Sequence, residues 1–567
     1  MPIAPRFLAW YVVIMKFIFI SGGVVSGLGK GVTAASVGLI LKSKGLRVTN
    51  VKIDMYLNVD AGTIRPQEHG EVFVCDDGIE TDQDLGNYER FLNESLKREN
   101  YMTTGQVYKS VIDRERAFGY NGEDVEAIPH VTDEIINRIK KAGKVNKADV
   151  VIIELGGTVG EYQNGLFFEA NRILKFKQPK DVIHVHVSFL PIIKSLGELK
   201  SKPAQQSAHI LNSMGIQADF LVARCERDID EKRKEKLALF CNLRSDHIIS
   251  NPDLDSIYKL PLYFEDQNFG EKILKSLHLK NKNGPGLAEW KDFVNRIISE
   301  KKEVKIAIVG KYFATGDYQL SDSYLCVIEA LKHAGAKIGV KPVLSWINTD
   351  EIEKSGAKNV LKDHDAILVP QGWGSRGVEA KLETVKFARE NNIPYLGLCF
   401  GMQMATIEFA RNVAKLVGAN SVESDPKTKY PVVHIMAEQK KYLAQHQYGG
   451  TIRLGSWPCK VKEGTLLDKA YKQFGTKPNE IIDQIVEERH RHRYEFNNEY
   501  RELLEKNGLI ISGTSPDGKL VEAVELSTKT HPFFMATQFH PEYKSRPLSP
   551  HPIFVAFLQA ISKNSKK

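Results

Sequence analysis

The chain has 567 residues and a mass of 63.8 kDa, too long for one ordinary hydrophobic core, so two to four domains are expected. Hydrophobic residues make up 42% and charged residues 26% of it, which is typical of a soluble globular protein. The net charge of +8, from 78 basic and 70 acidic residues, suits anionic small molecules such as nucleotides. No basic block with interleaved aromatic residues occurs, so nucleic acid is the weaker interpretation.

The cysteines and the N-terminal run bear on where the protein works. The six cysteines lie far apart with no CxxC pair, which excludes the usual zinc ribbon and predicts a reducing compartment. An apolar run at 7–20 is interrupted by Lys16 and continues into a glycine-rich turn. We interpret it as a buried strand, neither a signal peptide nor a membrane span. We expect translation to start at Met15 and the protein to be cytoplasmic.

Short apolar runs alternate with amphipathic stretches, which predicts α/β domains built on parallel sheets covered on both faces. In the first half, strands are predicted at 48–54, 148–155, 181–189 and 218–224, with helices at 132–141 and 204–214. The sequence NKNGPG at 281–286 breaks the pattern, and a short helix is predicted at 288–299. The pattern restarts at 304, with a strand at 304–312, helices around 321–334 and at 378–391, and strands within 365–374 and 394–403. We therefore predict two doubly wound parallel-sheet domains, at 1–281 and 304–567, joined by a linker at 282–303.

The strand KFIFIS enters the glycine-rich turn SGGVVSGLGKG at 21–31, and a helix is predicted to leave it near Val32. Glycines let backbone amides face a phosphate, the helix N-terminus adds partial positive charge, and Lys30 supplies a full one. The strict phosphate-loop pattern is not met, because the glycines are one residue too far apart and Gly31 stands where Ser or Thr is usual. A purely structural turn is the alternative, and the lysine at the helix start favours phosphate binding.

A glycine at the end of this loop cannot hold magnesium, so carboxylates would have to. Asp82 and Asp84 in ETDQD are candidates, and so is Glu154, at the carboxyl end of a predicted strand where α/β sheets bind ligands. Loop acids and a helix cap are the alternatives. Lys200 and Lys202, before a proline and a helix, form an anion-binding arrangement or else an ordinary solvated turn.

In the second half, PYLGLCFGMQ at 394–403 places Cys399 on a sharp turn between a strand and a helix, flanked by glycines. Small neighbours permit the strained turn that exposes a nucleophile, and the helix N-terminus favours the thiolate. Later, MATQFHPEY supplies His540 and Glu542. On a strand, residues i and i+2 share one face, so the carboxylate can orient the imidazole that serves the thiol. A buried core thiol and a structural histidine are the alternatives for each residue alone, but together the pattern predicts catalysis.

The turn PQGWG at 370–374 also follows a predicted strand and offers backbone amides. Gly372 is the predicted oxyanion donor, with the amide of Phe400 as its partner. An ordinary glycine turn is the alternative.

At this point the sequence resembles the CTP synthase family, from about Lys16 to about Ala560. The stretches that carry the resemblance are SGGVVSGLGKG, QEHGEVFVCDDGIETDQDLGNYERF, ELGGTVGE, KSKPAQ, LALFCN, DSIYKLP, PQGWGSRG, NNIPYLGLCFGMQ, GGTIRLG, ERHRHRYEFNN and QFHPE. The resemblance implies an N-terminal P-loop amidoligase domain and a C-terminal class I glutaminase domain. It implies a ligase that aminates UTP to CTP, using ATP, Mg²⁺ and ammonia from L-glutamine, with CTP as inhibitor and GTP as allosteric activator. A homotetramer with no nucleic-acid or membrane partner is expected.

The resemblance also implies site residues. The glutaminase chemistry would be done by Cys399, His540 and Glu542. Glutamine would be held by Gly372, Phe400, Gly401, Met402, Gln403, Glu423 and Arg493. ATP would be bound by Gly27, Leu28, Gly29, Lys30, Gly31, Val32 and Asp84, and magnesium by Asp84 and Glu154. The UTP and CTP site would comprise Ser26, Glu161, Tyr162, Gln163, Lys200, Ser201, Lys202, Pro203, Ala204, Gln205 and Lys236. Lys52 would be a second lysine of the ligase site, His69 would line an ammonia passage, and GGTIRLG at 449–455 resembles a lid linked to GTP activation.

Four positions depart from the family pattern. Met55 stands in place of proline, Gln163 in place of an acid, Ala204 in place of threonine and Gln371 in place of the first of two glycines. The first three put nucleotide affinity in question. Two other functions are alternatives. One is another glutamine-fed phosphate-loop ligase, against which KSKPAQ and GGTVGE argue. The other is a filament-forming structural protein, which would leave the Cys-His-Glu set unexplained.

Overall fold

The structure is a computed structural model that describes residues 15–66, 70–193, 195, 197–299, 301–311, 314–315, 318–319, 321–436, 439, 441–442 and 450–564. The chain divides into two compact units. Unit 1 comprises Met1–Val59 and Glu99–Ala288, and unit 2 comprises Asp60–Arg98 and Glu289–Lys567. Within the described residues, no helix combines the length and the apolar character needed to cross a bilayer.

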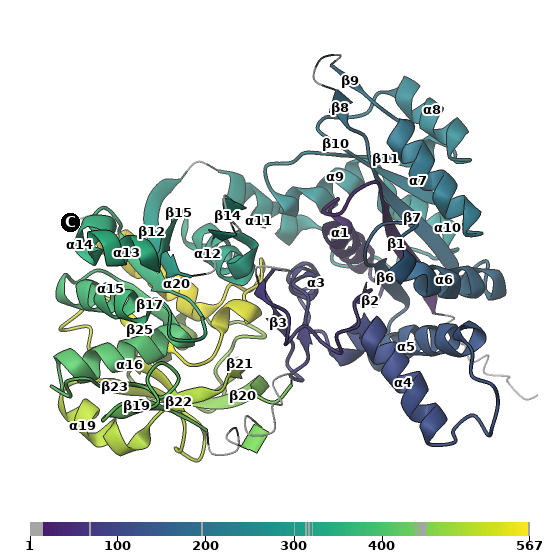
Figure 1. Ribbon diagram of the computed structural model, residues 1–567. Helices are drawn as coiled ribbons and strands as arrows, with labels where there is room; N and C mark the ends of the chain where they lie inside the picture. The colour runs from purple at the N-terminus through teal and green to yellow at the C-terminus, as the bar shows by residue number, and fades with distance from the viewer. Residues whose placement is uncertain are drawn as a thin grey trace, which may run out of the picture. The chain divides into compact units, whose positions relative to one another are not determined.

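Unit 1 is built on a sheet whose seven strands are all parallel, in the order β11-β10-β7-β1-β6-β2-β5 (Figure 1). These are β1 (Lys16–Gly23), β2 (Val48–Asp54), β5 (Tyr101–Thr103), β6 (Val150–Leu155), β7 (Val182–Phe189), β10 (Phe220–Cys225) and β11 (Ile248–Pro252). The predicted strands of the first half coincide with β2, β6, β7 and β10. They form because their residues are apolar on both faces, as a sheet covered by helices on each side requires.

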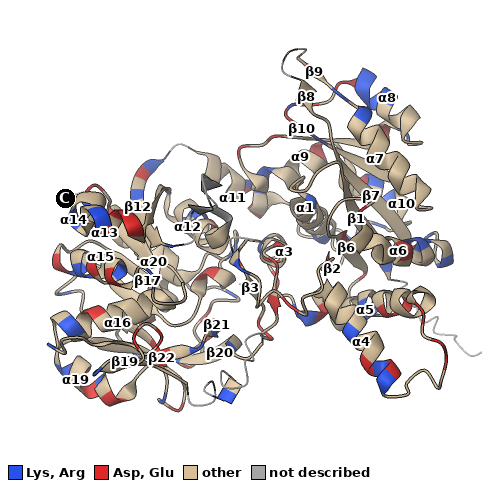
Figure 2. Ribbon diagram, in the orientation of Figure 1, with Lys and Arg blue, Asp and Glu red and all other residues tan. Residues whose placement is uncertain are grey.

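Helices connect these strands. They are α1 (Lys30–Ser43), α4 (Thr104–Arg116), α5 (Thr132–Val145), α6 (Gly165–Lys177), α7 (Lys202–Ser213), α8 (Glu231–Phe240), α9 (Leu260–Asp266) and α10 (Phe269–Ser276). A small hairpin of β8 (Ile192–Ile193) and β9 (Glu198–Leu199) precedes α7. Acidic and basic residues are interspersed along most of the helices (Figure 2), which agrees with the small net charge.

Unit 2 contains a nine-stranded sheet in the order β15-β12-β16-β17-β25-β24-β23-β20-β21. The strands are β12 (Lys302–Gly310), β15 (Val340–Asn348), β16 (Ala366–Val369), β17 (Tyr395–Leu398), β20 (Arg453–Val461), β21 (Ile485–His492), β23 (Ile510–Thr514), β24 (Val521–Glu525) and β25 (Phe534–Thr537). The first five in the sheet are parallel, and the rest are antiparallel. The predicted parallel α/β class is therefore confirmed for both units. The antiparallel extension of the second sheet is not predicted from the sequence.

Side chains of the parallel strands in unit 2 alternate between two apolar cores. Along β12, Ala307 and Val309 join one core while Ile306 and Ile308 join the other. This is the period of two expected of a sheet covered on both faces. The first core lies against α13 (Thr349–Ser355), α14 (Ala357–Leu361), α15 (Val378–Glu390), α16 (Phe400–Asn412) and α19 (Arg501–Lys506), and the second against α12 (Leu325–Ile338), α18 (Leu466–Phe474) and α20 (Pro552–Asn564).

The segment Asp60–Arg98 belongs to unit 2, although it lies far from the rest of that unit in sequence. It carries β3 (Phe73–Val74), β4 (Glu80–Thr81) and α3 (Asp84–Leu92). Phe91 of α3 packs on Trp290 of α11 (Ala288–Ile298), with ring centroids 5.0 Å apart. The remaining small elements are β13 (Ala314–Thr315), β14 (Tyr318–Gln319), β18 (Asn420–Ser421), β19 (Pro431–Ile435) and β22 (Tyr494–Phe496).

Candidate active sites

Cys399 sits between β17 and α16 with a backbone of φ 51° and ψ −97°, a conformation that L-residues rarely adopt. Its N–H donates to the carbonyl of Thr537 in β25 at 2.7 Å, which anchors the turn to the sheet. A Cβ added to Gly401 would come within 2.1 Å of the Val369 carbonyl oxygen, so only glycine fits there. The turn is strained, buried and tightly packed, as a nucleophile elbow is.

His540 and Glu542 lie beyond the end of β25. His540 Nδ1 is 2.8 Å from Glu542 Oε1, and both side chains are buried. The prediction that they share one face of a strand is wrong: the strand ends at Thr537, and Pro541 starts a short 3₁₀ helix, Pro541–Lys544. The helical turn, and not strand periodicity, brings the carboxylate to the imidazole.

Cys399 and His540 face each other across this turn. Burial lowers the pKa of His540, but the nearby Glu542 and Cys399 outweigh burial and raise that pKa to about 10. The Cys399 Sγ also approaches the carbonyl of Arg491, at 3.8 Å, and the side-chain amide of Gln538, at 3.6 Å. An imidazolium held beside a thiol in this way supports nucleophilic catalysis with proton transfer.

The turn at 370–374, which we call the oxyanion turn, follows β16 directly. Phe400 opens α16, so its N–H belongs to the first helical turn and has no acceptor within the helix. A Cβ on Gly372 would lie 3.7 Å from the Phe400 ring, so the two predicted oxyanion donors are neighbours. Gly374 N–H donates to Glu423 at 2.7 Å, and burial raises the pKa of Glu423.

The other predicted glutamine residues surround this turn. Gln403 is buried in α16 and donates to the Tyr494 carbonyl at 3.1 Å. Arg493 is buried and donates to the Thr451 hydroxyl at 3.2 Å. Met402 and Gly401 are buried in the first turn of α16. The structure thus brings the glutaminase residues named from the sequence into one region of unit 2.

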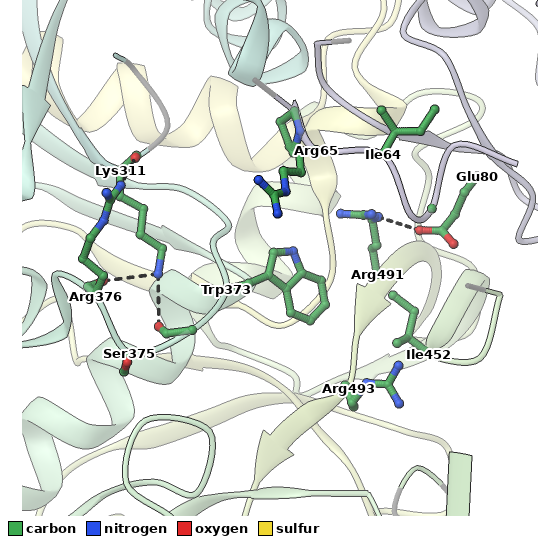
Figure 3. Close-up of a pocket in the computed structure, with 13 residues that line it drawn as sticks. Ile64, Arg65, Glu80, Lys311, Trp373, Ser375, Arg376, Ile452, Arg491 and Arg493 are labelled. Carbon is green, nitrogen blue, oxygen red and sulfur yellow. Dashed lines mark hydrogen bonds and ion pairs between the residues drawn. The ribbon is translucent and has the colours of Figure 1, made fainter. Parts of the chain in front are cut away.

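A cavity of about 660 Å³ opens beside this region (Figure 3). Its lining is Gly62, Ile64, Arg65, Pro66, Glu80, Lys311, Trp373, Gly374, Ser375, Arg376, Ile452, Arg491 and Arg493. The Arg491 guanidinium lies 5.7 Å from the centre of the Trp373 ring, and Arg491 Nε donates to Glu80 at 2.9 Å. The cavity therefore offers an indole surface among several basic side chains.

Sequence reasoning missed Arg489 and Arg491. They alternate with the predicted Arg493 on one strand and its continuation, so the spacing in ERHRHRYEF was the available signal. Arg489, fully buried, binds Asp76 at 2.6 Å and Glu89 at 3.0 Å, both in the Asp60–Arg98 segment. The carbonyl of Arg489 also accepts from the His540 N–H at 2.8 Å. One strand thus contacts both the catalytic turns and the inserted segment.

In unit 1, the glycine-rich turn leads from β1 into α1. Gly29 caps the helix with φ 81°, and Gly27 has φ 74°, so both need the freedom of glycine. Lys30 folds across Gly22, where a Cβ would meet Lys30 Cδ at 2.8 Å, and its Nζ donates to the Gly157 carbonyl at 2.7 Å. A cavity of about 100 Å³ lies beside the turn, lined by Leu28, Gly29, Val32, Arg224, Asn251, Pro252, Leu254, Ile257 and Leu260.

Glu154 lies at the carboxyl end of β6, next to β1, as predicted from its strand. It is buried, and Lys52 Nζ from β2 donates to it at 3.0 Å. Asp84 and Asp82 belong to unit 2, where the Asp82 carboxylate accepts from the Asp84 N–H at 2.9 Å at the start of α3. Within the described ranges, no group of three or more His, Cys, Asp or Glu side chains is placed to hold a metal.

Most of the residues assigned to UTP and CTP occupy two neighbouring parts of unit 1, at 161–163 and 200–205. Gly160 approaches α7, because a Cβ on it would lie 3.0 Å from Ile210. Glu161 accepts from the Thr158 N–H at 2.6 Å, while Tyr162 and Gln163 are exposed. At the start of α7, Ser201, Ala204 and Gln205 are buried, Lys200 and Pro203 are half-buried, and Lys202 is exposed; Ser26 and Lys236 are also exposed. His69, Gly449 and residues 1–14 lie outside the described residues.

Comparison with known proteins assigns the family. The family model described as CTP synthase N-terminus matches residues 16–279, and glutamine amidotransferase class-I matches 319–560. A CTP synthase of Caldanaerobacter subterraneus subsp. tengcongensis is 49% identical over 96% of this chain and 98% of its own. One of Methanocaldococcus jannaschii is 50% identical over the same shares. The solved glutaminase domain of Trypanosoma brucei CTPS with bound acivicin is 36% identical, with a TM-score of 0.40, over 46% of this chain and 94% of that one. This chain belongs to the CTP synthase family.

Proposed function

We propose that the chain converts UTP, ATP and L-glutamine into CTP, ADP, phosphate and glutamate, with the residues described above in the following roles. The observation that carries the assignment is the strained Cys399 turn beside the His540–Glu542 pair, in a chain that also holds a glycine-rich turn ending in Lys30. The first group supplies ammonia and the second supplies an activated UTP.

Unit 1 performs the ligase chemistry. The 4-oxygen of the uracil ring is a poor leaving group, so ATP must phosphorylate it before ammonia attacks C4 and expels phosphate. The amides of residues 27–32 and the Lys30 ammonium bind the phosphates and stabilise the charge that spreads over the transferring group. The small cavity beside Leu28 and Val32 suits part of the ATP base.

Within unit 1, magnesium would be held by Glu154. One or two carboxylates would be enough to hold magnesium beside nucleotide phosphates, so a cluster of three protein ligands is not required. Glu154 fits this role because it is a buried carboxylate at the carboxyl end of β6, paired with Lys52. When bound, the ion neutralises part of the phosphate charge.

Unit 2 performs the glutaminase chemistry. The Cys399 thiolate attacks the glutamine amide carbon, and the amides of Gly372 and Phe400 stabilise the oxyanion. The His540 imidazolium gives its proton to the departing ammonia as the thioester forms. Neutral His540 then takes a proton from water, which cleaves the thioester and releases glutamate. Glu542 keeps the imidazole in place throughout, while Glu423 and Arg493 hold the charged end of the substrate.

Ammonia made in this way is delivered internally, because free ammonia is mostly protonated at neutral pH and then is no nucleophile. Regulation follows the family: CTP competes at the UTP site, and GTP activates. The cavity lined by Trp373 and Arg491 supports GTP binding, since it offers a ring surface for a base and cations for phosphates. Exposed apolar side chains of unit 1, among them Tyr108, Ile112 and Phe118, support self-association. The oligomer that we propose is the homotetramer expected of the family, in the cytoplasm.

The test separates the two nitrogen sources. Cys399→Ala is expected to abolish glutamine-driven CTP synthesis and to leave synthesis from ammonium chloride at raised pH near the wild-type rate. Cys459→Ala is the matched control, because Cys459 is a buried thiol of the same unit that contacts the core and not the site. Glutamine-driven synthesis that survives in Cys399→Ala, or ammonia-driven synthesis lost from a folded variant, would overturn the assignment.

A further inference from the structure

A buried carboxyl group outside the Cys-His-Glu set touches the oxyanion turn. Glu71 is 3% exposed and accepts two hydrogen bonds: from the side-chain amide of Gln371 at 2.7 Å and from the backbone N–H of Cys326 at 2.6 Å. Gln371 immediately precedes Gly372, the predicted oxyanion donor, and its carbonyl accepts from the Tyr324 hydroxyl at 3.2 Å. Glu71 therefore holds the side chain of Gln371, and the backbone of Gln371 leads directly into Gly372 of the oxyanion turn.

The same segment also reaches the base. The carbonyl of Val72 accepts from the Tyr543 hydroxyl at 3.1 Å, and the Tyr543 ring stacks on His540 with centroids 4.9 Å apart and planes at 10°. Residues 71 and 72 thus contact the oxyanion side and the imidazole side of the glutaminase site. Both lie in the region that matches the CTP synthase N-terminus, and both pack within unit 2.

Gln371 carries an unsatisfied atom at this contact. Its Oε1 is buried and accepts no hydrogen bond from the residues that the structure describes. A carboxamide can rotate by 180° and exchange its oxygen and nitrogen. In the arrangement of the structure, the Gln371 NH₂ donates to a Glu71 carboxylate. In the rotated arrangement, the Gln371 oxygen accepts a hydrogen bond from the O–H of a protonated Glu71. The NH₂ group then lies where Oε1 lies in the structure.

We propose that Glu71 is a positioning residue of the glutaminase. Glu71 and Gln371 form a buried carboxyl–amide pair that holds the oxyanion turn in place. This pair has two hydrogen-bond arrangements, which differ by one proton on Glu71. The ionised arrangement is the productive one, because the two carboxylate oxygens accept from the Gln371 NH₂ and from the Cys326 N–H together. This inference rests on the proposed glutaminase function of the same site and assigns a role to a residue that touches no substrate.

The charges around Glu71 place the exchange near neutral pH. Burial raises the pKa of Glu71, and the hydrogen bond from the Cys326 N–H lowers that pKa in part. The negative charge of the neighbouring Glu542 raises the pKa further, so that it reaches about 7. Among the described residues, the other ionisable groups close to Glu71 are Cys326 itself, Arg90, whose guanidinium lies 3.7 Å from the Cys326 sulfur, and Tyr543. Loss of the hydrogen bond from Gln371 would raise the pKa of Glu71 above this value, because that bond stabilises the carboxylate.

The experiment compares Glu71→Gln and Gln371→Met with wild type in glutamine hydrolysis across pH 6 to 9. Wild type is expected to lose kcat as pH falls through about 7. Glu71→Gln should lower kcat about tenfold at pH 8, with little change in KM, and should flatten this acid limb. Gln371→Met, which keeps side-chain length and removes the amide, should move the limb to higher pH. Glu525→Gln is the control, because Glu525 is a buried carboxylate of the same unit that accepts the N–H groups of Leu466 and Leu467, remote from the turn.

Ammonia-driven CTP synthesis by each variant reports folding and should stay within about twofold of wild type, since Glu71 acts only on glutamine hydrolysis. Profiles of Glu71→Gln and Gln371→Met that superimpose on wild type would overturn the inference. If Glu71→Gln does not fold, the direction in which Gln371→Met moves the acid limb decides alone. Failure of the proposed function is a different result, namely wild-type hydrolysis of glutamine that does not require Cys399.

Discussion

Replacing Glu542 with Gln removes one negative charge beside His540 and keeps the shape of the side chain. The carboxylate lies 2.8 Å from His540 Nδ1, and both groups are buried. Two unit charges about 4 Å apart, at an effective dielectric constant of about 20, attract each other by about 4 kcal/mol. That energy corresponds to roughly a thousandfold in the equilibrium that forms the imidazolium. The kcat/KM for glutamine should therefore fall about tenfold at pH 8 and several hundredfold, on the order of 500-fold, near pH 10.

The pH dependence distinguishes this mechanism from general damage. Glu542 and Cys399 raise the pKa of His540 to about 10 against the effect of burial, so wild type keeps the imidazolium up to that pH. In Glu542→Gln the burial effect remains and the main opposing charge is gone, so His540 loses its proton at much lower pH. The ratio of wild-type to variant activity should therefore grow as pH rises from about 6.5 towards 10.

Glutamate release at several pH values measures this ratio, and ammonia-driven CTP synthesis checks that the rest of the enzyme is intact. Glu525→Gln again serves as the control, since it removes a buried carboxylate of unit 2 outside the site. A ratio that stays below about tenfold up to pH 10, or one that does not change with pH, would refute the electrostatic role of Glu542.

Three further predictions concern other parts of the molecule. Lys30→Ala should slow CTP formation from both glutamine and ammonia by about a hundredfold or more, because both routes need phosphorylated UTP; near-normal turnover in a CTP assay would remove Lys30 from the mechanism. Gln163→Glu should lower the CTP inhibition constant, since a charged hydrogen bond to the cytosine amino group is stronger than a neutral one; an unchanged constant would show that residue 163 does not contact the base. Glu89→Ala should lower the free energy of unfolding by about 3–5 kcal/mol in a denaturant titration, because it leaves the buried Arg489 with one partner fewer. The control Glu502→Ala, at an exposed position, should lower it by less than about 0.5 kcal/mol. Equal losses in the two variants would contradict this account.

Local patterns in the sequence predicted much of the fold. Apolar runs of four to nine residues between turn signals correspond to strands, and the glycine-rich and PYLGLCFGMQ turns lie where a strand meets a helix. These features are set by neighbours in sequence, so one chain is enough to see them. The pairing of His540 with Glu542 was predicted for a wrong reason, because proline and the following residues form a helical turn that strand periodicity does not anticipate.

What the sequence did not reveal depends on long-range contacts. The antiparallel extension from β24 to β21 consists of strands whose order in the sheet differs from their order in the chain. Arg489 looks like a surface residue in a charged stretch, yet it is fully buried because Asp76 and Glu89 meet it from about 400 residues away. Gln371 was noted as a departure from the family, and its partner Glu71 could not be inferred without the fold.

The separation of these partners has a consequence for how the chain is made. Asp76 is 413 residues from Arg489 in sequence, so a ribosome adding about 5–20 residues per second needs about 20–80 seconds between them. Throughout that interval the nascent segment Asp60–Arg98 carries Phe73, whose ring packs against Arg489 and Tyr543 in the completed unit. The Phe73 ring is thus available to chaperones, or to neighbouring nascent chains, until the last third of the protein has been synthesised. The glutaminase half completes its core with a piece of chain that was translated first.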